Sequence, residues 1–334
     1  MCDKTDQTDT AENENNQAAL VNLKSFEHGR GVFTWGSNVE GQVGGECWGY
    51  YLEIYAVRNF LGTPVVKVAC GASFTVVLCV DGSTWSWGDN TSGQLGKINT
   101  NPKTPLIPGK FVSVPQQIWT DKQTVDIACG DEHALFVDQQ GTVFGCGSNR
   151  AGQLNWGKHN SKNQSSVQLP TKCIAVACGY DFSMALDKDR YLIYKFGAKV
   201  PNVIFTPHAC KLNSEGKLIG AKEPQKGDEI VQMSGAATHG ACITARGDMY
   251  LWGETCWTSN LKEPAYRTFD LSNADLFHCA WSIENPVSSV TCSYEQTYAV
   301  SNGKVFLFTK PPHGQPKPTR PVDTINPVPT QLTV

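Results

Sequence analysis

The sequence predicts an all-β protein, a single β-propeller with six blades (range five to seven), each blade being a four-stranded antiparallel sheet. Three observations predict this fold. One pattern of apolar residues and glycines returns along the chain at intervals of 50 to 59 residues. Each copy reads as three short strands and a weaker fourth, joined by turns that contain glycine. A sheet of this size cannot bury both faces alone, so we expect the copies to stack face to face around an axis.

The clearest copy of the repeat runs from Val66 to Gly96. A first apolar run ends in Cys-Gly, a second ends in an Asp-Gly turn, and a third ends in Trp-Gly-x-Asn followed by Gly-Gln-Leu-Gly. Further copies span residues 125–154, 176–197, 231–253 and 290–308, and a half-copy at residues 32–44 opens the set. The copy at 176–197 lacks the Gly-Gln-Leu segment.

Glycines recur at two places in the repeat, and we expect them to be structural. The glycine after the third apolar run ends a strand where the backbone turns sharply, and the glycine of Gly-Gln-Leu supplies a positive φ. The predicted structural repeat positions are Gly36, Gly71, Gly88, Gly130, Gly147, Gly179, Gly197, Gly235 and Gly253.

Cysteines also recur at one repeat position, namely Cys70, Cys129, Cys178 and Cys292. One interpretation is a ring of metal ligands around the axis, and the other is a small apolar residue where the inner strands crowd together. Ser234, which the alignment of the copies places at the same position, keeps the size but has no thiolate. The chain has no Cys-x-x-Cys pair and its histidines are scattered, so we predict neither a metal nor a cofactor.

Composition divides the chain into three parts. Residues 1–27 form a polar, acidic-leaning N-terminal tail, residues 28–309 form the propeller, and residues 310–334 form a proline-rich tail or ring clasp. The first blade lacks its inner half in the repeat pattern. We expect Ala18–Phe26, or the tail after Phe308, to supply it, because an unpaired blade edge exposes a row of backbone groups.

Charge and hydrophobicity exclude several classes of partner. The net charge of −3 and pI near 6.2 disfavour nucleic acid, and no apolar run is long enough to insert in a membrane. The N-terminus lacks a signal peptide, so the thirteen cysteines are expected as reduced thiols. The sequence thus predicts a monomer in the cytoplasm, with the nucleus as a second compartment.

The combination of Cys-Gly, Asp-Gly, Trp-Gly-x-Asn and Gly-Gln-Leu-Gly resembles the regulator of chromosome condensation repeat, from about Val32 to Phe308. The resemblance implies a β-propeller. Members of this family typically have seven blades, whereas the length of the repeat region here leaves five to six. In the members that exchange guanine nucleotides, the resemblance implies that acidic and histidine side chains of one propeller face touch a small GTPase.

Asp131 and His133 match that type of loop and are the candidate exchange site, and Glu132 between them and His239 at the repeat position of His133 are further candidate partner contacts. A structural hydrogen bond within the blade is the alternative role for both histidines. Two features count against exchange. We find no insertion equivalent to the β-wedge of the exchange factors, and the N-terminal residues are acidic where those factors carry a basic arm.

Aromatic residues gather in the segments between the copies, and two pairs are predicted partner anchors: Trp48 with Tyr50, and Trp156 with His159. The sequence contains no nucleotide loop, nucleophile elbow or His-Glu-x-x-His motif, so no catalytic residues are predicted. It therefore predicts a non-enzymatic scaffold that binds a protein partner through its faces and loops. The alternative is a guanine-nucleotide exchange factor or regulator for a Ran- or Rab-like small GTPase.

Overall fold

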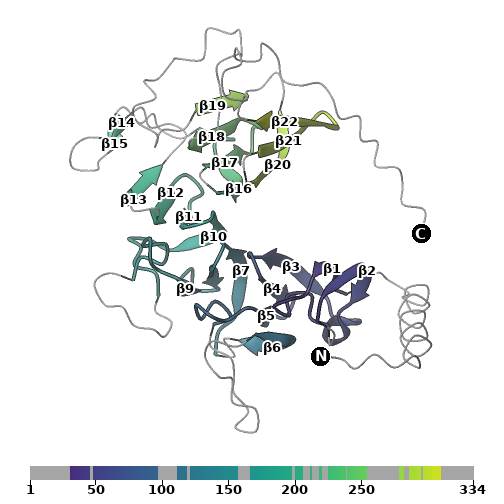
Figure 1. Cartoon of the computed structure of the whole chain (residues 1–334). Helices are drawn as coiled ribbons and strands as arrows, with labels where there is room; N and C mark the ends of the chain where they lie inside the picture. The colour runs from purple at the N-terminus through teal and green to yellow at the C-terminus, as the bar shows by residue number, and fades with distance from the viewer. Residues whose placement is uncertain are drawn as a thin grey trace, which may run out of the picture.

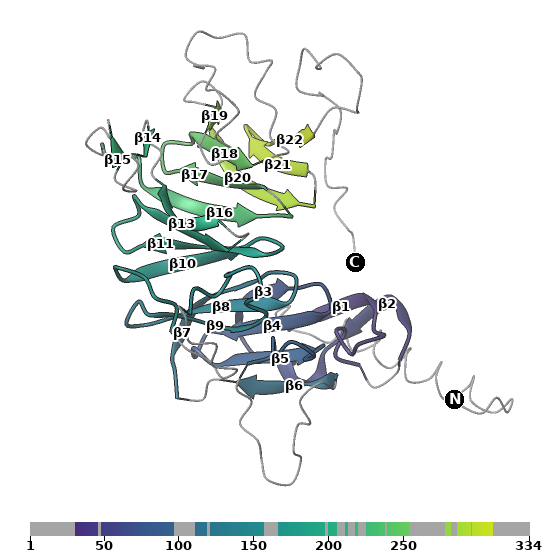
Figure 2. The ribbon, with the colours of Figure 1, turned by 60° about the vertical axis from the view of Figure 1, so that its left-hand side comes forward.

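The computed structural model describes residues 31–45, 48–96, 111–118, 121–156, 166–197, 200–205, 211–212, 218–219, 225–237, 239–253, 278–281, 286–294 and 296–309. Within these residues the regular structure is β, apart from one short 3-10 helix, η1 (Arg58–Phe60). No helix of this part of the chain has the length and apolarity to cross a membrane. The strands form small antiparallel sheets, which follow one another as blades around an axis (Figures 1 and 2).

We number the blades in chain order. Blade 1 contains β1 (Phe33–Ser37) and β2 (Tyr50–Ala56). Blade 2 contains β3 (Val65–Cys70), β4 (Phe74–Cys79), β5 (Thr84–Gly88) and β6 (Val112–Ile118), and blade 3 contains β7 (Thr124–Cys129), β8 (His133–Asp138) and β9 (Val143–Gly147). Blade 4 contains β10 (Cys173–Cys178), β11 (Phe182–Asp187), β12 (Ile193–Gly197) and β13 (Val200–Phe205). Blade 5 contains β16 (Ile230–Gly235), β17 (His239–Thr244), β18 (Met249–Gly253) and β19 (His278–Trp281). Blade 6 contains β20 (Val287–Ser293), β21 (Gln296–Ser301) and β22 (Lys304–Thr309), and a separate hairpin contains β14 (Lys211–Leu212) and β15 (Leu218–Ile219).

The hydrophobic core lies between blades. Strands β4, β8, β11 and β17, the second strand of blades 2 to 5, are buried along their whole length. Both faces of these strands are apolar because a neighbouring blade covers each of them. Phe74 and Leu78 of blade 2, for example, pack in one cluster with Ile127 and Phe136 of blade 3. Stacking of one blade on the next therefore supplies the core that a single blade lacks.

The recurrent asparagine and glutamine of each Trp-Gly-x-Asn and Gly-Gln segment hold the loop that follows the third strand. The Oδ1 atom of the asparagine accepts a hydrogen bond from the backbone N–H five residues later, at 2.7–3.2 Å. The Oε1 atom of the glutamine accepts one from the N–H two residues earlier, at 2.9–3.0 Å. The three copies are Asn38 with Gln42, Asn90 with Gln94, and Asn149 with Gln153. The predicted positive φ occurs at the glycine of each, for example 80° at Gly93.

The same loops join each blade to the next. The carbonyl oxygen of Gln42 in blade 1 accepts a hydrogen bond from Trp87 Nε1 in blade 2, at 2.9 Å. The carbonyl of Gln94 accepts from Cys146 Sγ of blade 3 at 3.1 Å, in the same way. The sequence motif thus caps its own loop and also supplies a contact between blades.

Blade 5 departs from the predicted alignment by one residue. In the first strand, Cys70, Cys129 and Cys178 pair with the second residue of the next strand, and in blade 5 Gly235 takes that place, opposite Gly240. The alignment that placed Ser234 with the cysteines and Gly235 with the repeat glycines is therefore wrong. Gly235 is as far from His239 as Cys129 is from His133, so the turn is no longer than in blade 3, and Ala236 holds the place of the repeat glycine, its N–H donating to the carbonyl of His239 at 2.9 Å.

The described blades form an open arc (Figure 1). Among the described residues, no strand of blade 6 pairs with a strand of blade 1. The two predicted clasps, Ala18–Phe26 and the tail at 310–334, lie outside the described residues. Blade 1 therefore has two described strands where blades 2, 4 and 5 have four.

Candidate partner-binding surface

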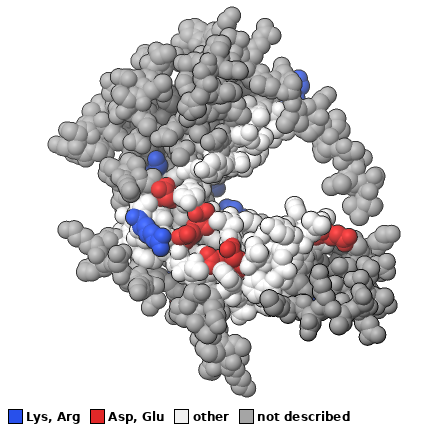
Figure 3. Space-filling view, in the orientation of Figure 1, with Lys and Arg blue, Asp and Glu red and all other residues white. Residues whose placement is uncertain are grey.

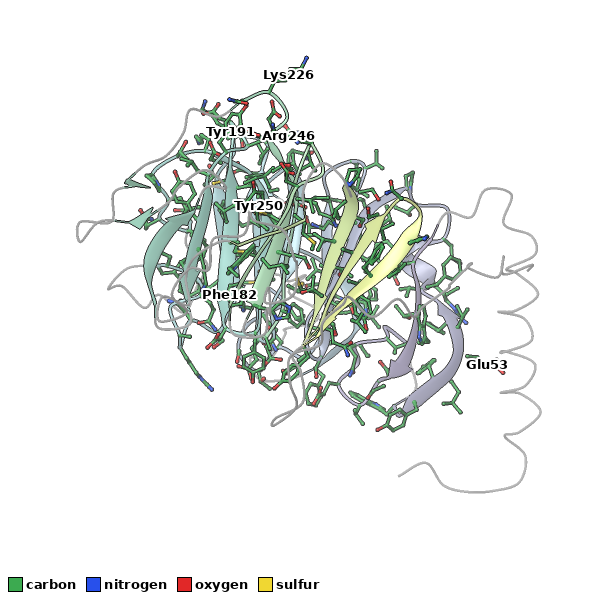
Figure 4. The ribbon with its side chains drawn as sticks, turned by 90° about the horizontal axis from the view of Figure 1, so that it is seen from above. Glu53, Phe182, Tyr191, Lys226, Arg246 and Tyr250 are labelled. Atoms are coloured by element: carbon green, nitrogen blue, oxygen red, sulfur yellow. The ribbon has the colours of Figure 1, made fainter. Side chains whose placement is uncertain are left out.

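The candidate residues lie at one end of the blades, where the first strand turns into the second. Figure 4 shows Phe182, the first residue of β11, at this end, and Tyr191 and Arg246 at the other. We call the end that carries Phe182 the front face, because it faces the viewer in Figures 1 and 3. The opposite end is the back face.

Backbone hydrogen bonds tie the front-face turns of successive blades together. The N–H of Ala72 in blade 2 donates to the carbonyl of Asp131 in blade 3, at 3.2 Å. The N–H of Asp131 donates in turn to the carbonyl of Tyr180 in blade 4, at 3.3 Å, and Tyr180 donates to Ala236 in blade 5, at 3.0 Å. The turns are thus fixed relative to one another, although they come from four separate repeats.

Acidic side chains gather on the front face over the middle of the arc (Figure 3). Burial raises the pKa of Asp131 and the Glu132 carboxylate raises it further, while a hydrogen bond from Tyr180 acts in the opposite direction. Glu132 accepts a hydrogen bond from Ser92 Oγ of blade 2, at 3.0 Å. The two predicted carboxylates are thus side by side, partly exposed and held by neighbouring blades.

Two exposed tyrosines accompany these carboxylates. Tyr180 is 53 % exposed and Tyr294 of blade 6 is 69 % exposed. The charge of Asp131 raises the pKa of Tyr180 most strongly, with smaller contributions from Glu132 and Tyr294, so the four groups lie within electrostatic range of one another. Exposed tyrosine is the residue type that anchors many protein interfaces, because it combines a large apolar ring with a hydroxyl.

A second aromatic group lies at the front end of blades 1 and 2. Trp48 and Tyr50, a predicted anchor, are 62 % and 74 % exposed. The Trp48 ring packs edge-on against Phe111, with 6.1 Å between ring centroids. Because Tyr50 pairs with Ser37 at the end of β1, these rings lie at the front end of the blades. This pair is available to a partner.

The two histidines predicted as partner contacts are buried between blades. His133 Nε2 is 2.9 Å from Ser183 Oγ of blade 4, and His239 Nε2 is 2.9 Å from Thr297 Oγ1 of blade 6. Burial lowers the pKa of His133 to about 4 and also lowers the pKa of His239. Both rings are therefore neutral contacts between blades, and neither reaches a partner at the surface.

The structure describes one residue of the second predicted anchor pair, Trp156 with His159. Trp156 is partly buried and packs against the core between blades 3 and 4. His159 lies outside the described residues. Of this pair, the described Trp156 is thus less exposed than Trp48 and Tyr50.

Three of the four recurrent cysteines, namely Cys129, Cys178 and Cys292, are buried or partly buried as the packing interpretation requires, whereas Cys70 is exposed. Burial raises the pKa of Cys178 to about 12 and that of Cys292 to about 11, and it raises that of Cys129 well above its usual value. Protonated thiols are poor metal ligands, because the thiolate is the form that binds. Among the described residues, no group of three His, Cys, Asp or Glu side chains is arranged to hold a metal ion.

Sequence reasoning missed Tyr180 and Tyr294 of the front face, although Tyr180 and Asp131 hold the same position after the repeat glycine.

The amino-acid sequence matches known repeats. The model of the regulator of chromosome condensation (RCC1) repeat matches residues 31–78, 81–137 and 140–186. The probable E3 ubiquitin-protein ligase HERC3 of Homo sapiens is 28 % identical over 192 residues, which are 56 % of this chain and 18 % of HERC3. The probable E3 ubiquitin-protein ligase HERC6 of Homo sapiens is 36 % identical over 169 residues, which are 50 % of this chain and 16 % of HERC6. The chain thus spans less than a fifth of the length of these relatives.

Solved structures share the fold. The crystal structure of human WBSCR16 has a TM-score of 0.61 at 18 % identity, covering 88 % of this chain and 78 % of that chain. Prp20p of Saccharomyces cerevisiae, described with its binding properties to Gsp1p and histones, has a TM-score of 0.59 at 21 % identity, covering 83 % and 67 %. These matches confirm the predicted all-β propeller and the predicted resemblance. The chain is therefore a β-propeller that is similar to the RCC1 repeat over residues 31–186.

Proposed function

We propose that this propeller is a non-enzymatic interaction scaffold whose front face binds a basic segment of a partner protein. The observation that carries the proposal is the group of Asp131, Glu132, Tyr180 and Tyr294, which three blades bring together on one exposed face. Carboxylates pair with Arg and Lys, and the faces of tyrosine rings attract the same cations. A segment that carries Arg between apolar residues uses both kinds of contact.

The surrounding structure supports this proposal because the site is held in place before a partner arrives. The turns that carry Asp131 and Tyr180 are linked by backbone hydrogen bonds, so little ordering is needed on binding. The exposed Trp48 and Tyr50 extend the same face toward blade 1. Histones, which Prp20p is described as binding, are an example of a basic protein partner.

The test compares proteins captured from cells by the wild-type chain and by the variant Asp131→Asn with Glu132→Gln. We expect the variant to capture at least tenfold less of the main partner than the wild-type chain does. We also expect capture by the wild-type chain to fall steeply as the salt concentration rises. The control is Asp189→Asn, which removes an exposed carboxylate from the back face. Equal capture by all three proteins would contradict a front-face site.

The second candidate is regulation of a small GTPase through the same two carboxylates. The resemblance to exchange factors favours it, and Asp131 and Glu132 are accessible, whereas the buried His133 is not. The measurement is release of labelled guanine nucleotide from a panel of Ran- and Rab-like GTPases. Acceleration by the wild-type chain that Asp131→Ala with Glu132→Ala abolishes establishes this candidate, and absence of acceleration across the panel removes it.

A further inference from the structure

The inner strand of blade 2 exposes an apolar residue at a register that blades 3, 4 and 6 bury and that Met233 of blade 5 fills with a partly buried side chain. Val68 of β3 pairs with Val77, and the residues at the same register are Ile127 in β7, Val176 in β10 and Val290 in β20. Val68 is 45 % exposed, whereas the other three are 0, 4 and 1 % exposed. One position of the repeat is thus uncovered in blade 2 alone among these four.

The cause lies in blade 1. Strand β1 ends in Trp-Gly and corresponds to β5, the third strand of blade 2, which pairs with the second strand β4. Among the described residues β1 pairs with β2 only, so its inner edge has no described neighbour. The space that a first and a second strand fill in the other blades is the space that Val68 faces.

The chain's own repeats specify what fills such a space. The first strand of a blade presents a small residue to the next blade, and the second strand presents two larger apolar residues. In blade 2 these are Ala69 with Val76 and Leu78, in blade 3 Ala128 with Leu135 and Val137, and in blade 4 Ala177 with Met184 and Leu186. The unit that fits is therefore an antiparallel hairpin with one small and two branched or long apolar side chains on one face.

We propose that blade 1 is an acceptor site for such a β-hairpin, donated by a second polypeptide. One strand of the hairpin pairs, through backbone hydrogen bonds as in β-augmentation, with the edge of β1 that no described strand covers. The apolar face of the hairpin covers Val68 of blade 2. This site is separate from the front-face carboxylates, so the two sites are able to bind different segments.

The residues in register with β3 and the residues of the C-terminal tail favour a second polypeptide as the donor, and the apolar residues of Ala18–Phe26 are the competing source that the test below removes. Gly36 and Gly88 hold equivalent positions, so the segment in register with β3 is 13–18, which reads Asn-Glu-Asn-Asn-Gln-Ala. These polar residues are depleted in strands and offer no apolar face. Residues 310–334 contain seven prolines, and proline lacks the N–H that a central strand donates.

The test uses the full chain and a labelled synthetic peptide with the sequence of residues 124–138, which is the chain's own hairpin β7–β8. We expect saturable binding, together with slower amide exchange in β1. Val68→Asp is expected to weaken binding at least tenfold, because it puts a charge beneath the hairpin. The matched control is Val80→Asp, which changes an exposed valine of the same blade outside the acceptor site and is expected to leave binding unchanged.

Two further measurements make the proposal refutable. A peptide with Leu135→Pro, which cannot complete the strand, is expected not to bind. Absence of saturable binding of the original peptide, or equal binding to the Val68→Asp chain, overturns the acceptor site.

A chain with Leu20→Asp, Val21→Asp and Leu23→Asp tests whether the N-terminal segment of the same chain is the donor of the strand. If that chain binds the peptide much more tightly than the wild type does, the N-terminal segment competes for the site, and donation by a second polypeptide is overturned.

Discussion

At the scale of single residues, histidine and phenylalanine alternate at one repeat position according to what the next blade offers. His133 faces Ser183, and His239 faces Thr297, so each imidazole has a hydroxyl partner. Phe74 and Phe182 hold the same position in blades 2 and 4. The corresponding residues of the blades that follow them are Ala134 and Gly240, which have no hydroxyl. The residue at this position therefore pairs with the next blade either through a hydrogen bond to a hydroxyl group or through an apolar contact.

The buried His133 predicts a loss of stability in acid. Its pKa is about 4 in the folded protein, against about 6.5 in the unfolded chain, so the unfolded chain binds the proton more readily. Its neutral form contributes fully above pH 6.5, and the free energy of unfolding falls as the pH drops from 6.5 toward 4. Integrated over that window, the loss from this one group approaches about 3 kcal/mol. Urea denaturation at pH 7, 5.5 and 4.5 measures it.

The matched variant is His133→Phe combined with Ser183→Ala, which installs the apolar pair of the neighbouring blades. It is expected to reduce the dependence of the unfolding free energy on pH between 6.5 and 4. A pH dependence identical to that of the wild type would contradict the role assigned to His133.

The sequence alone predicted a structural hydrogen bond as one role of His133 and His239. It did not show that these histidines are buried, because their burial depends on which blades pack against each other.

At the scale of secondary-structure elements, one carboxylate links three inner strands. Asp126 of β7 accepts a hydrogen bond from Lys67 Nζ of β3 at 2.7 Å, and its other oxygen accepts from the N–H of Val176 in β10 at 2.8 Å. The Lys67 side chain is 42 % exposed, whereas that of Asp126 is 15 % exposed. The contact to the backbone N–H is thus the better protected of the two.

This difference predicts unequal effects of removing each partner. Asp126→Ala leaves the N–H of Val176 without its acceptor and is expected to cost about 2–3 kcal/mol of unfolding free energy. Lys67→Met keeps the stem of the side chain and removes only a half-exposed ion pair, so its cost is expected to stay below about 1 kcal/mol. Asp126→Asn keeps an acceptor and is expected to fall between the two. Denaturant titration of the three variants tests this order, and an equal cost for Lys67→Met and Asp126→Ala would contradict it.

The strands themselves were well predicted from the sequence, because apolar runs bounded by glycine turns mark both their existence and their order. The register of blade 5 was not, since Ser234-Gly235 looks like the Cys-Gly pair of the other copies, whereas Gly235 itself stands in the place of the cysteine. The candidate surface was predicted in part: Asp131 and Glu132 are at an exposed turn, while Tyr294 joins them through the circular arrangement of the blades. Contacts across a ring of repeats leave no local pattern in the sequence.

At the scale of the whole molecule, stability depends on neighbours, because each blade is covered only where another blade packs against it. Blades 2 to 5 each have a second strand that is buried throughout, whereas β21 of blade 6 alternates between buried and half-buried residues. In blade 1, Leu52 and Ile54 of β2 are 93 % and 53 % exposed. The two ends of the arc are therefore its least supported parts.

This arrangement predicts a gradient of amide hydrogen exchange along the chain. Protection is expected to be highest in β8 and β11, which are buried along their whole length between two neighbouring blades, and to decrease toward β2 and β21, where local opening breaks fewer contacts. Exchange followed by mass spectrometry on peptides from each strand measures this gradient. Protection of β2 and β21 equal to that of β8 would mean that the two ends of the arc cover each other in solution. A selective gain of protection in β1 when a hairpin peptide is added would instead show that the ends stay apart and that blade 1 is filled from outside.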